Sequence, residues 1–121
     1  MIEQVKSKMT EAFHHFNKKD GIRMDSIRIK IVKNDSLLGF TLMNKTDKVR
    51  DTDLSEMIGV MASMLAKGEL YKSVEKLINE NGLDEKEACV KIYPAENLSP
   101  LVHLFNNGKA LKSVEIEKLL N

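Results

Sequence analysis

The chain has 121 residues, a common size for one domain, of which 42% are hydrophobic and 31% charged. This composition is typical of a globular protein and excludes an intrinsically disordered chain. The formal net charge of +1 gives no global field that would draw the protein to nucleic acid or to a membrane. With 2 prolines and no low-complexity tract, the sequence contains no linker, so we expect a single domain over residues 1–121.

The cysteine content and the first residues bear on the compartment. One cysteine, Cys89, cannot form an internal disulfide, which favours a reducing environment. The opening residues, MIEQVKSKMTEAF, are charged throughout and lack the apolar core of a signal peptide. No apolar run approaches the roughly 18–20 residues that span a bilayer. We therefore expect a cytoplasmic protein that does not enter a membrane.

The first third of the chain combines two hydrophobic periods. Residues 2–18 place apolar side chains at helical spacing and so predict an amphipathic helix, which ends at Asp20-Gly21. Residues 27–31 change to period two, which is typical of a half-buried strand. Asn34-Asp35 is then a plausible turn, and residues 37–43 form the returning strand of a predicted β-hairpin.

The middle of the chain predicts a loop followed by two helices. Residues 44–52 are polar and indicate the loop. Asp53 stands three residues before Glu56, as in a capping box, and a helix is expected to about residue 67. A further helix is expected over residues 69–81, since its apolar positions share one face and Asn81-Gly82 follows them.

The last third predicts one strand and two more helices. Residues 88–93 alternate apolar and polar side chains, which favours a strand, although a helix over 84–93 is a competing interpretation. Ser99-Pro100 is a cap followed by proline at the first helical position, and it predicts a helix that ends at residues 106–108. A last short helix is expected over residues 113–120.

The resulting fold class is α+β, with the order α-β-β-α-α-β-α-α. We expect a small, mostly antiparallel three-stranded sheet packed against helices. The segments DGIRMDSIRIKIV and NGLDEKEACVKIY also resemble each other, aligning Gly21 with Gly82 and Lys30 with Lys91. This resemblance favours a strand in the second segment, unless the two helix-to-strand joints look alike only because such joints share their chemistry.

No motif in the sequence points to catalysis, and we expect no enzyme, no metal and no cofactor. His14 and His15 are adjacent, whereas metal-binding pairs on a helix sit at i and i+4. Cys89 and His103 would form a nucleophile and base only if an activating environment surrounded the thiol, and none is visible. The acidic residues between 47 and 56 lack the register of a calcium loop.

The predicted helix over residues 53–67 is apolar around most of its circumference. One interpretation is a central core helix. The other is an interface with a second copy or a partner protein, since a domain of this size has little material to cover every side. The interface candidates are Met57, Val60, Met61 and Met64.

The predicted strands carry basic side chains on their polar face. If the isoleucines of residues 27–31 point inward, Arg28 and Lys30 point outward, as do Lys91 and Tyr93 on the later strand. A basic sheet face with an aromatic side chain suits single-stranded nucleic acid. The competing explanation is that lysines protect an exposed strand from pairing.

Three functions follow, in order of preference. The first is a small non-enzymatic regulatory or adaptor domain that acts through protein–protein contact, including self-association as a homodimer. The alternative is a nucleic-acid-binding regulator that uses the basic sheet face. The second alternative is a small-molecule binder with a pocket lined by Met57, Met61, Phe40 and Tyr93.

Overall fold

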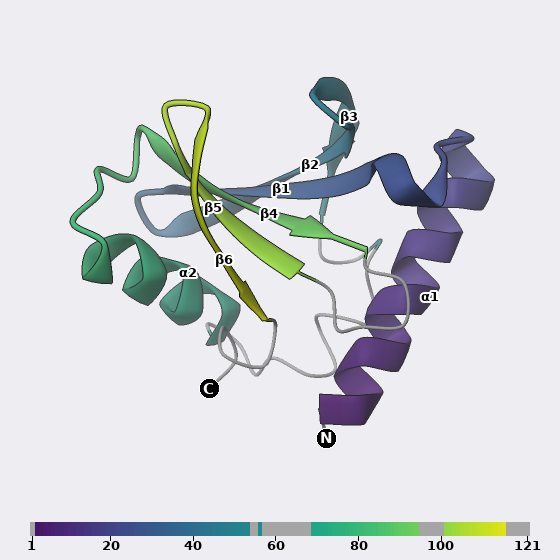
Figure 1. The fold of residues 1–121 in the computed structure, drawn as a ribbon, viewed down its shortest axis with the longest axis horizontal. Helices are drawn as coiled ribbons and strands as arrows, with labels where there is room; N and C mark the ends of the chain where they lie inside the picture. The colour runs from purple at the N-terminus through teal and green to yellow at the C-terminus, as the bar shows by residue number, and fades with distance from the viewer. Residues whose placement is uncertain (1, 54–55, 57–68, 95–100, 116–121) are drawn as a thin grey trace.

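A computed structural model describes residues 2–53, 56, 69–94 and 101–115, and for residues 2–9, 69 and 70 it describes the backbone. In this part of the chain the helical elements are α1 (Ile2–Asp20), α2 (Glu69–Glu80) and a short 3₁₀ turn, η1 (Met24–Ser26). The strands are β1 (Ile27–Asn34), β2 (Leu37–Asn44), β3 (Asp47–Thr52), β4 (Ala88–Tyr93), β5 (Leu101–Asn106) and β6 (Lys109–Glu115). They form one antiparallel sheet in the order β3-β2-β1-β4-β5-β6 (Figure 1).

The predicted α+β class with three strands and five helices is wrong. The described part of the chain is mostly sheet, with six strands and two α-helices. The helix over 2–18, the hairpin of β1 and β2, the helix over 69–81 and the strand over 88–93 are confirmed. The competing prediction of a helix over residues 84–93 is therefore wrong.

Residues 44–52, predicted as a loop, contain β3. This strand lies at the edge of the sheet and most of its side chains are exposed. An edge strand is in contact with one neighbour only and often carries charges that prevent further pairing. Its sequence, DKVRDT, therefore lacks the apolar alternation from which a half-buried strand is predicted.

Residues 101–106, predicted as a helix, form β5. Val102 and Leu104 are buried in the core, and the side chains between and beside them are half-buried on the other face. Because apolar residues occupy 101, 102, 104 and 105, the same letters fit a helical stripe and a strand with apolar groups on both faces. The segment is a strand because it pairs with β4 on one side and with β6 on the other, which its own apolar pattern does not reveal.

The residues taken as the end of that helix form the tight turn between β5 and β6. Asn107 has φ 51° and Gly108 has φ 79°, and a two-residue type I′ hairpin turn needs positive φ at both positions. Residues 113–115, predicted to begin the last helix, belong to β6. The rest of that predicted helix, 116–120, and the predicted helix from residue 57 to 67 lie outside the described residues.

Both described helices pack on the same face of the sheet, which we call the core face. In Figure 1, α1 lies at the right of the molecule and α2 at the lower left, with the strands between and above them. The buried cluster contains Ala12, Phe13 and Phe16 from α1, Val74, Leu77 and Ile78 from α2, and Ile27, Ile29, Ile31, Phe40, Leu42, Ala88, Val90, Ile92, Val102 and Leu104 from the strands. Neither helix is long and apolar enough to cross a membrane.

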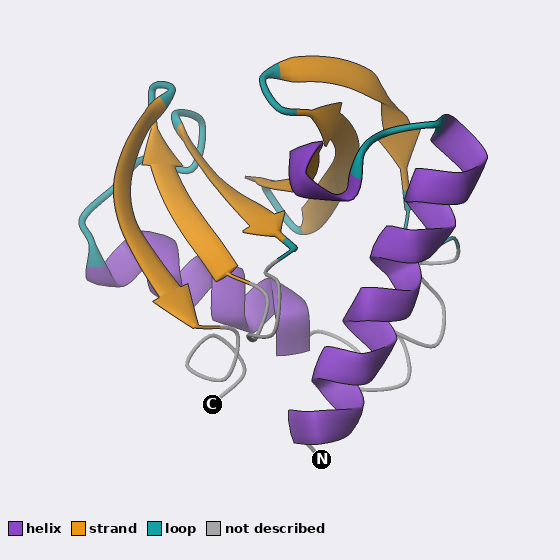
Figure 2. Ribbon diagram, turned by 45° about the vertical axis from the view of Figure 1, so that its right-hand side comes forward, coloured by secondary structure: helices purple, strands orange, loops and turns teal. Residues whose placement is uncertain are grey.

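The fold consists of two similar halves, each a helix followed by three antiparallel strands. Figure 2 shows the first meander beside α1 and the second beside α2. The register of β2 with β3 shifts between Leu42 and Met43, and that of β5 with β6 shifts between Leu104 and Phe105. The turns that follow β2 and β5 each begin with a positive-φ residue. These matches lie far beyond the helix-to-strand joints, so generic joint chemistry does not explain them.

The central strand pair reveals the axis that relates the halves. Ile29 pairs with Ile92, Lys30 with Lys91, and Ile31 with Val90. In the alignment of the two halves Ile29 corresponds to Val90, and Ile31 to Ile92. Exchanging the halves therefore maps this register onto itself, and the internal two-fold axis passes between Lys30 and Lys91.

Candidate nucleic-acid interface

The four residues predicted as a basic platform lie together on the side of the sheet opposite the core face. Arg28 and Lys30 alternate with buried isoleucines of β1, and Lys91 and Tyr93 alternate with buried residues of β4. The register places Lys91 beside His103 of β5. We define the basic sheet face as the six half-buried residues Arg28, Lys30, Lys91, Tyr93, His103 and Phe105.

Arg28, on the β1 side of this face, is held in place by several contacts. Its guanidinium carbon lies 3.9 Å from the ring centroid of Tyr93. Its Nη1 donates to the carbonyl oxygens of Asp25 and Ile27, each at 2.9 Å. A guanidinium fixed by main-chain acceptors and a ring loses little conformational entropy when it meets a ligand.

The aromatic side chains continue from Arg28 across β4 and β5. The ring centroids of Tyr93 and His103 are 4.2 Å apart at 36°, and those of His103 and Phe105 are 6.4 Å apart at 43°. Nζ of Lys91 lies 4.5 Å from the Phe105 centroid. His103 and Phe105 were missed as site residues because β5 was predicted to be a helix. The period-two burial of β5 is the signal that identifies them.

Burial and neighbouring cations shift the pKa values of two titratable groups on this face, His103 and Cys89. Burial, reinforced by Arg28, lowers the pKa of His103 below its ordinary value, so its imidazole is neutral at pH 7. Burial raises the pKa of the Cys89 thiol, against the opposing effect of Lys30 and Lys91. Cys89 and His103 share this face, but the thiol is kept protonated at neutral pH, and a protonated thiol is a weak nucleophile.

The remaining predicted site residues give no assembled site. Met57, Val60, Met61 and Met64 lie outside the described residues. Phe40 is part of the core, whereas Tyr93 lies on the basic sheet face, so the two cannot line one small-molecule pocket. Among the described residues no group of His, Cys, Asp and Glu could hold a metal ion.

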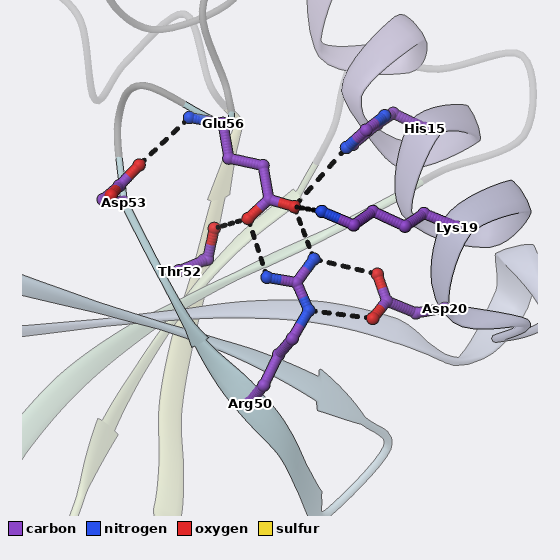
Figure 3. Close-up of polar contacts among 7 residues, drawn as sticks. All are labelled: His15, Lys19, Asp20, Arg50, Thr52, Asp53 and Glu56. Carbon is purple, nitrogen blue, oxygen red and sulfur yellow. Dashed lines mark hydrogen bonds and ion pairs between the residues drawn. The ribbon is translucent and has the colours of Figure 1, made fainter.

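A second polar cluster surrounds Arg50 of the edge strand β3 (Figure 3). Arg50 donates to both carboxylate oxygens of Asp20, from Nε at 2.8 Å and from Nη2 at 3.0 Å. It also donates to both oxygens of Glu56, from Nη1 at 2.7 Å and from Nη2 at 2.5 Å. The guanidinium thus joins the end of α1 to the segment after β3.

The carboxylate of Glu56 has further partners in the same cluster. Lys19 Nζ lies 3.0 Å and His15 Nε2 3.5 Å from its Oε1, and Thr52 donates to its Oε2 at 2.6 Å. Its main-chain N–H donates to Asp53 Oδ1 at 3.0 Å, the bond expected from the capping pattern. Arg50, the largest influence, lowers the pKa of Glu56 and of Asp20. Each acceptor is satisfied by a partner within the chain, so this cluster is a structural tie.

Comparison with protein-family models, with curated proteins and with solved structures finds no match to this chain.

Proposed function

We propose that this protein is a non-enzymatic domain that binds single-stranded nucleic acid on its basic sheet face. The observation that carries the proposal is the clustering of three cations and three rings on the same side of the central strands. Proteins that bind single strands combine cations that neutralise the backbone with side chains on which bases stack. The compartment we propose is the cytoplasm, because a single cysteine favours a reducing environment.

The two kinds of contact divide between different residues. Arg28, Lys30 and Lys91 supply the charge for phosphate oxygens. Arg28 and Lys91 already lie against the rings of Tyr93 and Phe105. Bases would therefore stack on the side of Phe105 away from Lys91 and on the neutral ring of His103. Stacking of one base contributes about 1–3 kcal/mol.

The charge distribution across the sheet favours a path along the central strands. The carboxylates on this side belong to the edge strands: Asp51 of β3 pairs with Thr41, and Glu115 of β6 pairs with Leu101. The centre of the sheet is thus positive, and at its β3 margin Asp51 is neutralised by Lys48 at 3.2 Å. This arrangement also opposes self-association through the basic sheet face, because two copies would bring their central cations together.

Fluorescence anisotropy with a labelled 20-nucleotide strand tests the proposal. We expect the double variant Arg28→Gln, Lys30→Gln to bind about tenfold more weakly or worse, and we expect wild-type affinity to fall steeply with salt. The control is Lys72→Gln with Lys86→Gln, which removes the same charge from exposed positions elsewhere. Equal affinity of the two double variants would contradict the proposal.

The protein–protein function rests on the helix over residues 53–67 and stays a prediction. Its interface candidates lie outside the described residues, so none of their contacts supports it. Sedimentation of the full chain at micromolar concentration tests the homodimer form directly, because a monomer would contradict it.

A further inference from the structure

The lysines in the described part of the chain differ in their burial and in whether a carboxylate pairs with them. Those whose side chains are described are exposed except for Lys30, Lys33 and Lys91, which are half-buried. Lys33 forms ion pairs with Glu75 and Glu85. Lys30 and Lys91 have no carboxylate partner among the described residues. Burying a charged side chain is costly unless an anion compensates it, and these two half-buried lysines lack the carboxylate partners that Lys33 has.

The two lysines without a carboxylate partner are also direct neighbours, and of the two Lys91 lies against the ring of Phe105. They are opposite each other in the register of β1 with β4, at the internal two-fold axis. Side chains directly opposite in an antiparallel pair have Cβ atoms about 4.5–5.5 Å apart, and like charges there are destabilising. An unfavourable pair at the middle of the sheet is a common sign that a position serves binding rather than folding.

The neighbours in the same cross-strand row cannot neutralise the pair. Thr41 lies beside Lys30, and His103, neutral at pH 7, lies beside Lys91. Asp51 of β3 lies opposite Thr41, one strand further along this row. Its carboxylate already pairs with Lys48 at 3.2 Å and accepts a hydrogen bond from Thr41 Oγ1 at 3.4 Å. No anion of the described residues compensates the pair, and a bound ligand can supply one.

We infer that Lys30 and Lys91 together bind one phosphate group, seated at the internal two-fold axis of the sheet. A tetrahedral phosphate presents oxygens to two ammonium groups at once, which relieves their repulsion, and Arg28 on the same face adds a third charge. The nucleic-acid form of this inference rests on the proposed function, in which the group is a backbone phosphodiester. The same chemistry is offered by a free phosphate ion, so the test has an arm for each source.

The first arm measures the salt dependence of oligonucleotide binding by wild-type protein and by Lys30→Gln with Lys91→Gln. The slope of log K against log salt is about −0.7 for each phosphate neutralised on a single strand. If both lysines serve one phosphate, the double variant reduces the slope by about 0.7, and either single variant loses nearly as much affinity as the double. A reduction of about 1.4 with additive losses means two separate contacts and overturns the inference.

The second arm titrates inorganic phosphate into ¹⁵N-labelled protein and follows the amide signals of residues 29–31 and 90–92. We expect saturable shifts in wild type and in Lys72→Gln with Lys86→Gln, and none in Lys30→Gln with Lys91→Gln. Phosphate binding without oligonucleotide binding upholds the phosphate site and refutes the nucleic-acid function. Oligonucleotide binding whose salt dependence is unchanged in the double variant upholds the nucleic-acid function and refutes the phosphate site. Absence of both kinds of binding overturns both.

Discussion

Replacing Arg50 with glutamine removes the cation that holds two carboxylates against each other. In the native structure Arg50 makes four hydrogen bonds, two to Asp20 and two to Glu56, at 2.5–3.0 Å. The side chains of Arg50, Asp20 and Glu56 are 30%, 10% and 17% exposed. Glutamine has no charge and fewer donors, so both carboxylates lose their main partner and repel each other.

The expected loss of stability lies between that of a surface pair and that of a buried one. Exposed ion pairs contribute about 0–1 kcal/mol, whereas breaking a buried pair costs about 3–5 kcal/mol. For this partly exposed cluster we expect Arg50→Gln to lower the free energy of unfolding by about 2–3 kcal/mol. At roughly 4 °C per kcal/mol for a chain of this size, the melting temperature should fall by about 8–12 °C.

Urea unfolding followed by circular dichroism measures this difference, with an unchanged m-value as the sign that the unfolding transition is comparable. Arg23→Gln is a matched control, because Arg23 pairs with Asp25 at 3.1 Å but the two side chains are 83% and 64% exposed. That control should lose less than about 1 kcal/mol. If Arg50→Gln were no more destabilised than Arg23→Gln, the cluster would not tie α1 to β3 as described.

Three further predictions concern the rest of the molecule. Because Arg50 lowers the pKa of Asp20 and Glu56 in the folded state, the unfolded chain binds more protons in acid, so the wild type should lose stability from about pH 5 down to pH 2. Arg50→Gln should lose less stability over that range, and parallel pH profiles from urea melts would contradict this. Leu42→Ala and Leu104→Ala, at equivalent buried positions of the two halves, should each cost about 2–5 kcal/mol, whereas Leu111→Ala, 49% exposed, should cost under about 1 kcal/mol. Burial raises the pKa of Cys89, so its reaction with an aromatic disulfide reagent at pH 8 should be much slower in the native protein than in urea, and equal rates would refute this.

The elements predictable from the sequence are those whose two faces differ strongly. The isoleucines of β1 alternate with Arg28 and Lys30, so the burial of one set places the other on the opposite face. The helix α2 buries Val74, Leu77 and Ile78 at helical spacing, and its end at Asn81-Gly82 is visible in the sequence. In these segments local pattern and tertiary structure agree.

The elements that could not be predicted are strands whose own residues lack a clear apolar–polar alternation, although the strands that pair with them are near in sequence. β5 has apolar or aromatic side chains on both faces, because one face meets the core and the other carries His103 and Phe105. β3 is strand only because β2 pairs with it, and its polar side chains conceal this. For the same reason four of the six residues of the basic sheet face were predictable, whereas the two on β5 were not. The contact of Arg50 with Asp20 joins residues of different elements, and no spacing in the sequence predicts it.

The claim that nucleic acid binds on the basic sheet face is tested most directly by the ring signals of the aromatic side chains. The rings divide between the two faces: Tyr93, His103 and Phe105 lie on the basic sheet face, and Phe13, Phe16 and Phe40 are buried in the core. An NMR titration with an unlabelled single-stranded 20-mer should shift the ring protons of the first set and leave those of the second set unchanged. Unchanged signals of Tyr93, His103 and Phe105 at saturating oligonucleotide would contradict the account.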